Sequence, residues 1–371
     1  MSDHTPASSG KKTNPLGGPV LFVILLLLVA GGVLGYVYYT NRTPEDPEGM
    51  MGFRAGVEQQ QALMKLREVY SDLDGDLLAD RPADNLLNPE VLVFSEIATA
   101  DFDKDETKWK PFLDHLAKAT GKQVKMWRNQ PLKIDPGEKD LPAGLLTRTA
   151  PGTQEQMRAL AAGELHITAF NTGAVTAAVN TTGFHPAYCP AGTDGKHGYE
   201  MEVIVPASSS VQKPEDLRGK KVAFVSMSSN SGGRAGLVYL KSLGMTPVKD
   251  YAFLFTGTHY ASIQAVAAGR VDAAFVANDL LRSEIEKGKV KPEQYRTIHK
   301  SDPFPPLCFG IGHNLDPALA DKIRQAFDSF TQLPAIYVNS PSRVKFVKVD
   351  YKKDWAFVRE VDEKLKEVIE P

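Results

Sequence analysis

From Val91 onward the chain alternates short apolar stretches with amphipathic segments, and this alternation restricts its fold more than any other feature. Val91–Phe94 and Gln123–Trp127 have the composition of strands, and between them the apolar residues of Trp109–Thr120 recur at helical spacing. Further strands are predicted at Leu165–Phe170, Tyr199–Val205, Lys221–Val225, Phe253–Phe255 and Ala273–Ala277, and further helices at Glu155–Ala162 and Ser262–Ala268. Such alternation predicts an α/β fold of two lobes with parallel sheets. Proteins with this fold bind ligands near the carboxyl ends of the strands or between the lobes.

The strand predicted at Lys221–Val225 runs into a segment of hydroxyl, amide and glycine residues before the helical pattern of Leu237–Leu240. A helix N-terminus presents unpaired backbone N–H groups and a positive partial charge, so side-chain donors gathered there suit an oxyanion. The candidate donors are Ser228, Ser229, Asn230 and Ser231. The alternative is an ordinary helix cap with additional serines.

Composition excludes several classes of protein. The 371 residues carry a formal net charge of −2, and no stripe of lysine and arginine with interleaved aromatic residues is present, so we expect no nucleic-acid partner. Two cysteines provide no disulfide framework. The sequence has no phosphate-binding loop, no nucleophile elbow and no zinc-protease motif, so we expect neither a cofactor nor enzymatic activity.

The N-terminal region predicts a membrane anchor. Residues 19–39 are long and apolar enough to cross a bilayer as one helix, and a small-x-small cleavage pattern does not follow them, although a cleaved signal peptide is the alternative. Lys11 and Lys12 precede this stretch and acidic residues follow it, which places the N-terminus in the cytoplasm. We therefore predict a cytoplasmic tail at 1–18, a transmembrane anchor at 19–39, a spacer at 40–90 and an extracytoplasmic two-lobed domain at 91–371. Within that domain, lobe 1 is predicted at about 91–198 and 298–371 and lobe 2 at about 199–297. We therefore expect a single-pass protein of the inner (cytoplasmic) membrane, with its binding domain in the periplasm or outside the cell.

The predicted spacer contains four acidic residues at alternate or near-alternate positions, Asp72, Asp74, Asp76 and Asp80. Oxygens spaced in this way can converge on calcium. Here the glycine lies between the second and third aspartates and Ala83 stands where a closing glutamate is expected. We therefore predict a solvated turn and no metal site.

The middle of the chain resembles the phosphate, phosphite and phosphonate substrate-binding proteins of ABC importers, which have the type II periplasmic binding protein fold. The resemblance rests on Lys213–Val225, the Ser-Asn-Ser-Gly run, Thr256-Gly-Thr-His259 and Ala265–Ala274, and it extends from Val91 to about Phe330. It implies a two-lobed binding domain that closes around a small phosphorus oxyanion.

The resemblance also implies the ligand-binding residues. Ser229, Asn230 and Ser231 match the family's phosphonate cradle, and His259 matches a histidine that contacts the same oxygens. Tyr199 matches a tyrosine at the crossover between lobes, and Asp279 matches an acid that faces the ligand's amino group. Ser228, Asn171, Thr172 and Thr153 are weaker candidates for ligand binding. Each has a structural alternative, such as a helix cap for Asp279 or a packing role for His259.

Two departures from the family pattern affect the expected ligand. Thr153 or Gln154 stands where a wall tyrosine is expected, and Leu307 stands where a second acid is expected, with Asp302 as a displaced candidate. With one acid missing, an aminoalkylphosphonate is less well supported than phosphate, phosphite or a simple alkylphosphonate.

The predicted function is therefore that of a membrane-anchored solute-binding protein that delivers a phosphorus oxyanion to separate ABC permease and ATPase subunits. The alternative is a sensor subunit for a small oxyanion that acts with a separate membrane signalling protein.

Overall fold

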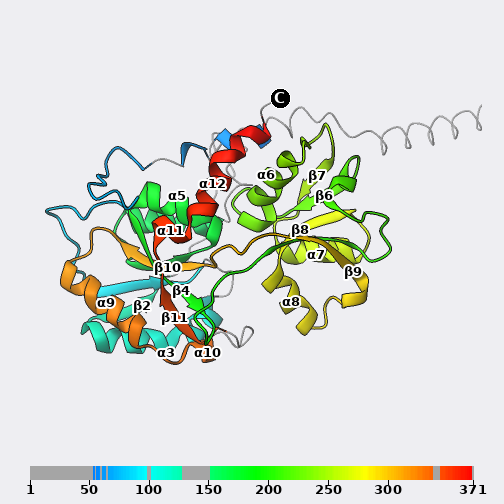
Figure 1. Cartoon of the computed structure of the whole chain (residues 1–371). Helices are drawn as coiled ribbons and strands as arrows, with labels where there is room; N and C mark the ends of the chain where they lie inside the picture. Colours follow the sequence, from blue (N-terminus) through cyan, green and yellow to red (C-terminus); the bar gives the residue numbers. More distant parts are fainter. Residues whose placement is uncertain are drawn as a thin grey trace, which may run out of the picture. The chain divides into compact units, whose positions relative to one another are not determined.

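Two separate β-sheets organise the part of the chain between Asp46 and Pro371 (Figure 1). The computed structural model describes residues 53–54, 56–58, 61–63, 66–97, 102–127, 151–336 and 343–369. The predicted anchor at 19–39 lies outside these ranges. Within them, no helix combines the length and apolar character that a membrane crossing requires.

The first sheet has six strands in the order β11-β4-β10-β3-β1-β2. Their bounds are β1 Val91–Ser95, β2 Gln123–Met126, β3 Ile167–Phe170, β4 Phe184–Ala191, β10 Cys308–Gly312 and β11 Lys345–Lys348. The strands β1, β2 and β3 are parallel, whereas β10 is antiparallel to β3 and β4, and β11 is antiparallel to β4.

The second sheet has five strands in the order β7-β6-β8-β5-β9. Their bounds are β5 Met201–Pro206, β6 Lys221–Phe224, β7 Ala252–Phe255, β8 Ala273–Ala277 and β9 Tyr295–Lys300. The strands β6, β7 and β8 are parallel, and β5 pairs antiparallel with both β8 and β9.

The prediction of parallel sheets is therefore confirmed for β1, β2 and β3 and for β6, β7 and β8, and it is wrong for the antiparallel strands beside them. The predicted strands and their alternation with helices are confirmed. The chain passes from the first sheet to the second between β4 and β5 and returns between β9 and β10. The strands that follow these crossings, β5 and β10, are not connected to their neighbours by a helix of the same lobe, and they run antiparallel to them. Both sheets are therefore mixed. The two connections meet where Tyr199 and Phe304 exchange backbone hydrogen bonds of 3.0 and 2.8 Å.

Helices cover both faces of each sheet. Their bounds are α3 Phe102–Thr120, α4 Pro151–Ala161, α5 Thr172–Thr182, α6 Ala235–Ser242, α7 His259–Ala267, α8 Asn278–Glu286, α9 Pro317–Ser329, α10 Leu333–Ile336, α11 Tyr351–Asp354 and α12 Ala356–Lys364. Short π or 3-10 turns lie at η1 Pro214–Leu217, η2 Asn230–Arg234, η3 Pro292–Gln294 and η4 Leu365–Val368. Helices α3 and α9 pack their apolar faces on the first sheet, and α7 and α8 pack on one face of the second.

A further apolar core joins the two lobes through the C-terminal helices. It contains Val175 of α5, Leu237 of α6 and Trp355 and Val358 of the C-terminal segment. Figure 1 shows α12 between α5 and α6. Both cysteines, Cys189 and Cys308, are buried free thiols.

Residues before β1 also contact both lobes. Phe53 packs its ring 5.3 Å from that of Phe253 in β7, and the Leu63 carbonyl accepts a hydrogen bond of 2.8 Å from Asn180 in α5. Between them, the Gln61 side chain donates to the Asp362 carbonyl of α12 at 2.6 Å. Part of the segment that the sequence predicts as a spacer thus packs on the folded body.

Candidate functional site

A cavity of about 770 Å³ lies between the two sheets, and it gathers most of the residues that the sequence singled out. Nine of the ten candidate ligand-binding residues line it: Asn171, Thr172, Tyr199, Ser228, Ser229, Asn230, Ser231, His259 and Asp279. The tenth, Thr153, is not among the lining residues and is 3% exposed within α4. Residues more than 100 positions apart in sequence therefore meet at one site.

The second lobe contributes the serine run at the end of β6. Ser229 caps the π-turn η2, where its Oγ accepts a hydrogen bond of 3.1 Å from the Gly232 N–H. A side-chain Cβ at position 232 would lie 2.8 Å from His259 Cε1, so glycine is needed for the histidine to approach the turn. The strand therefore delivers the hydroxyl residues to a helix N-terminus, as expected for an anion site.

His259 is held as a neutral hydrogen-bond donor. Its Nδ1 accepts the Ala277 N–H at 3.1 Å, which leaves the proton of the neutral ring on Nε2. Nε2 lies 3.3 Å from Ser229 Oγ. Burial lowers the pKa of His259 to about 4, even though the carboxylate of Asp279 acts in the opposite direction. The cavity therefore contains an imidazole N–H and not an imidazolium charge.

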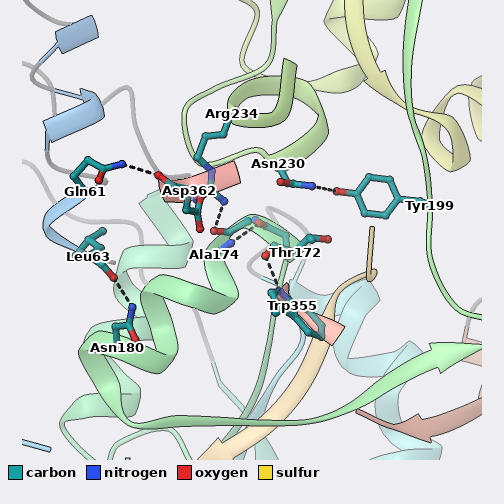
Figure 2. Close-up of polar contacts among 12 residues, drawn as sticks. Gln61, Leu63, Thr172, Ala174, Asn180, Tyr199, Asn230, Arg234, Trp355 and Asp362 are labelled. Carbon is teal, nitrogen blue, oxygen red and sulfur yellow. Dashed lines mark hydrogen bonds and ion pairs between the residues drawn. The ribbon is translucent and has the colours of Figure 1, made fainter. Parts of the chain in front are cut away.

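Two polar atoms of the serine run have no hydrogen-bond partner among the described residues. They are Ser231 Oγ and Asn230 Oδ1, on side chains of residues that are 1% and 2% exposed. The Asn230 amide donates to the Tyr199 hydroxyl at 3.4 Å (Figure 2). Burial raises the pKa of that tyrosine, although the side chains of Asn230 and Ser231 act to lower it, so Ser231 lies beside the tyrosine hydroxyl without a well-aligned hydrogen bond. Unpaired buried polar atoms are costly. An oxyanion oxygen can accept from the Ser231 hydroxyl, whereas Asn230 Oδ1 is itself an acceptor and needs a donor such as a P–OH group.

The first lobe contributes the N-terminus of α5. Asn171 caps this helix by accepting the Ala174 N–H at 3.0 Å, and the Thr172 hydroxyl donates to the Pro305 carbonyl at 2.7 Å. Figure 2 shows Thr172 on the helix that faces Asn230 and Tyr199. These side chains line the cavity, and the Thr172 side chain also interacts with the Tyr199 hydroxyl, whose pKa it acts to lower.

Asp279 forms an ion pair that the sequence did not reveal. Its Oδ2 lies 3.0 Å from Nη2 of Arg343, which precedes β11, and its Oδ1 accepts the Leu280 N–H. Leu307, which stands where an acid was expected, lines the same cavity. An ammonium group would therefore meet one paired carboxylate and one leucine. Arg343 lies beyond the stretch on which the resemblance rests, and no sequence signal pointed to it.

The acidic turn of the predicted spacer is not part of this cavity. Carboxylate oxygens of Asp72, Asp74 and Asp76 lie within 4.8 Å of one another. Each of the three also accepts a backbone N–H of the same turn, as does Asp80. The four carboxylates therefore cap backbone N–H groups of their own turn.

Comparisons with known proteins match the cavity-bearing part of the chain. A family model described as "ABC transporter, phosphonate, periplasmic substrate-binding protein" covers residues 141–355. The phosphate-import protein PhnD of Mycolicibacterium smegmatis is 32% identical over 142 residues, which span 36% of this chain and 44% of that protein.

Solved structures agree in fold. The XAC2383 protein of Xanthomonas citri bound to ATP has a TM-score of 0.60 at 17% identity, over 76% of this chain and 98% of that one. PhnD1 of Prochlorococcus marinus in complex with methylphosphonate has a TM-score of 0.56 at 15% identity, over 75% and 99%. At these identities the likeness shows the two-lobed periplasmic binding fold alone. Because the family model covers more than half of the chain, including the serine run and His259, this chain belongs to the periplasmic substrate-binding proteins of phosphonate ABC transporters.

Proposed function

We propose that the chain is the membrane-anchored, extracytoplasmic solute-binding component of an ABC importer for phosphate, phosphite or a simple phosphonate. It binds its ligand without chemical change and passes it to separate permease and ATPase subunits. The observation that carries this proposal is the buried Ser231 hydroxyl, which has no well-aligned hydrogen bond within the described ranges and lies in a cavity of neutral donors. Three or four such donors can coordinate tetrahedral oxygens without a cation.

The charged residues of the cavity narrow the ligand class. Asp279 and Arg343 are the charged residues that line it within the described ranges, and they pair with each other. Apolar side chains complete the wall, among them Ile97, Leu280 and Leu307. This favours an oxyanion with no substituent or a small apolar one over a ligand that carries an amine.

The test is thermal unfolding of the full chain, purified in detergent and stripped of ligand, with phosphate, phosphite, methylphosphonate, 2-aminoethylphosphonate and sulfate. A ligand at one hundred times its dissociation constant adds about 2.7 kcal/mol to the free energy of unfolding. We expect a phosphorus oxyanion to raise the melting temperature by several degrees. If none of the four phosphorus compounds raises the melting temperature, the proposal is contradicted.

A matched pair of serine variants assigns the effect to the cavity. At the same ligand concentration, Ser231→Ala should reduce the ligand-induced shift to half or less, whereas Ser208→Ala, at an exposed serine of the same lobe, should keep it. Equal shifts in both variants would mean that the ligand binds elsewhere.

The anchor is tested separately. We expect the full chain to remain with membranes after alkaline carbonate extraction, and a chain that lacks residues 1–39 to be released. Recovery of the full chain in the soluble fraction would favour a cleaved signal peptide. The matched family and the relatives are transport components, so the sensor alternative gains no support from them.

A further inference from the structure

Arg234 is a charged residue with no exposed surface, and it does not line the ligand cavity. It is the last residue of η2, the turn that also contains Asn230 and Ser231. A fully buried arginine is rare unless its guanidinium is paired. Its partners therefore indicate what the charge does.

The guanidinium joins three elements. Nη1 forms an ion pair with the Asp362 carboxylate of α12, and Nη2 donates to the Gly173 carbonyl at the start of α5 (Figure 2). Both charged side chains are 0% exposed. One side chain of the second lobe thus contacts the first lobe and the C-terminal helix at once.

Those contacts lie next to the candidate ligand-binding residues of both lobes. Gly173 follows Thr172, and a Cβ at Gly173 would lie 2.6 Å from the Ser228 carbonyl and 3.0 Å from the Asn230 nitrogen. The backbones of the two lobes therefore touch beside the cavity. An opening motion that separates them would also separate Arg234 from Gly173.

Neighbouring hydrogen bonds hold the partners of Arg234 in place. The Trp355 indole donates to the Thr172 carbonyl at 3.1 Å, and the Gln61 amide donates to the Asp362 carbonyl at 2.6 Å. Figure 2 shows both bonds next to the ion pair. The first-lobe end of the contact is consequently fixed by the C-terminal helices and by the segment before β1.

A purely structural role accounts poorly for this pair. Arg234 Nε has no hydrogen-bond partner among the described residues, and burial raises the pKa of Asp362 to about 6 although Arg234 and the Thr176 side chain act to lower it. Apolar side chains of similar volume often fill such a site at no loss of stability. An apolar pair could not supply the directional bonds by which Arg234 contacts Gly173 and Asp362.

We propose that Arg234 is a positioning residue that stabilises the closed arrangement of the lobes, by joining the ligand-binding turn η2 to Gly173 and Asp362. This inference rests on the proposed binding function. It assigns part of the ligand affinity to a residue that does not touch the ligand.

The test measures the distance between the lobes with and without ligand. Spin labels are placed at Lys118→Cys on α3 and Lys289→Cys in the second lobe, both exposed, while the native cysteines are buried. In the double variant Arg234→Met, Asp362→Leu we expect longer ligand-free distances than in the parent protein. We also expect a dissociation constant for phosphate or methylphosphonate about tenfold higher, because less of the protein is in the binding-competent state.

The control is an ion pair within one lobe. Arg218 and Asp250 form such a pair at 2.6 Å, so Arg218→Met, Asp250→Leu should leave the distances and the affinity unchanged. Arg234→Lys is the second variant if the double variant does not fold. It keeps the charge but lacks the forked donors, and it should lengthen the distances to a smaller extent.

If either folded Arg234 variant has the same ligand-free distances between spin labels and the same dissociation constant as the parent protein, the inference is wrong. If the parent protein binds none of the phosphorus oxyanions, the proposed function fails. The ligand-free distances would then still decide whether Arg234 holds the lobes together.

Discussion

The two sides of the cavity differ in how their polar side chains are used. On the second-lobe side, Ser231 Oγ and Asn230 Oδ1 have no partner among the described residues, and His259 is held as a donor by the Ala277 N–H. On the first-lobe side, Asn171 caps α5 and Thr172 donates to Pro305. In the proposed binding function, this difference supports a division of roles: the second lobe donates to the oxyanion, and the first lobe completes the wall of the cavity.

The strongest test of this difference is Ser231→Ala. A hydrogen bond to a charged group contributes about 1.5–3 kcal/mol, so we expect the dissociation constant for the oxyanion to rise roughly 10- to 150-fold. Titration calorimetry measures it. An affinity within twofold of the parent protein would place recognition outside the serine run.

The next largest effect is expected from Arg343→Ala, which leaves the Asp279 carboxylate without its ion-pair partner. We expect the affinity for 2-aminoethylphosphonate relative to methylphosphonate to rise by roughly tenfold, about 1.4 kcal/mol, because an ammonium group can replace the guanidinium. Competition binding with the two ligands measures this ratio. Lys348→Ala, which removes an exposed ion pair with Asp328, is the control and should not change it.

A smaller effect is expected on the first-lobe side. Thr172→Val removes the bond to Pro305 but keeps the side-chain shape, so it should cost about 1 kcal/mol of folding stability. The affinity should fall by roughly fivefold or less, since the hydroxyl serves the first lobe. A loss as large as that of Ser231→Ala would remove the contrast between the lobes.

The smallest effect concerns the charge state of His259. Since its pKa is lowered to about 4, its ring resonances should not titrate between about pH 5.5 and 8 in an NMR experiment on the ligand-free protein. The unfolded chain takes up a proton near pH 6.5 and the folded chain does not. His259 therefore contributes stability above that pH which is lost as the pH falls towards 4. A titration midpoint near 6.5 would show that the ring is not held as inferred.

The sequence was sufficient for the fold class and for the order of elements, because apolar periodicity marks each strand and helix along this chain. It was insufficient for strand direction. The antiparallel pairing of β5 with β8 depends on where the chain crosses between sheets, which local patterns do not encode. The sequence also did not predict that α3 begins at Phe102, because the residues between Phe102 and Trp109 are mostly charged and show no apolar periodicity.

At the site, local motifs located the residues that lie together in sequence, such as Ser228–Ser231 and Thr256–His259. They could not show that Asp279 pairs with Arg343, which is 64 positions away. Nor could they show that the Ala277 N–H binds the Nδ1 atom of His259. Both features arise from tertiary packing, and both alter the charge of the cavity.

The contact between Gln61 and Asp362 also has a practical consequence. It places the first and last described parts of the folded body next to each other, with Phe53 and Val368 in the same apolar core. A fragment that begins near Phe53 and ends near Val368 has its two ends close together, and domains of this kind tolerate circular permutation. A permuted chain with new ends in an exposed loop could therefore carry a fluorescent protein at the old junction, and would report ligand through the packing of α12.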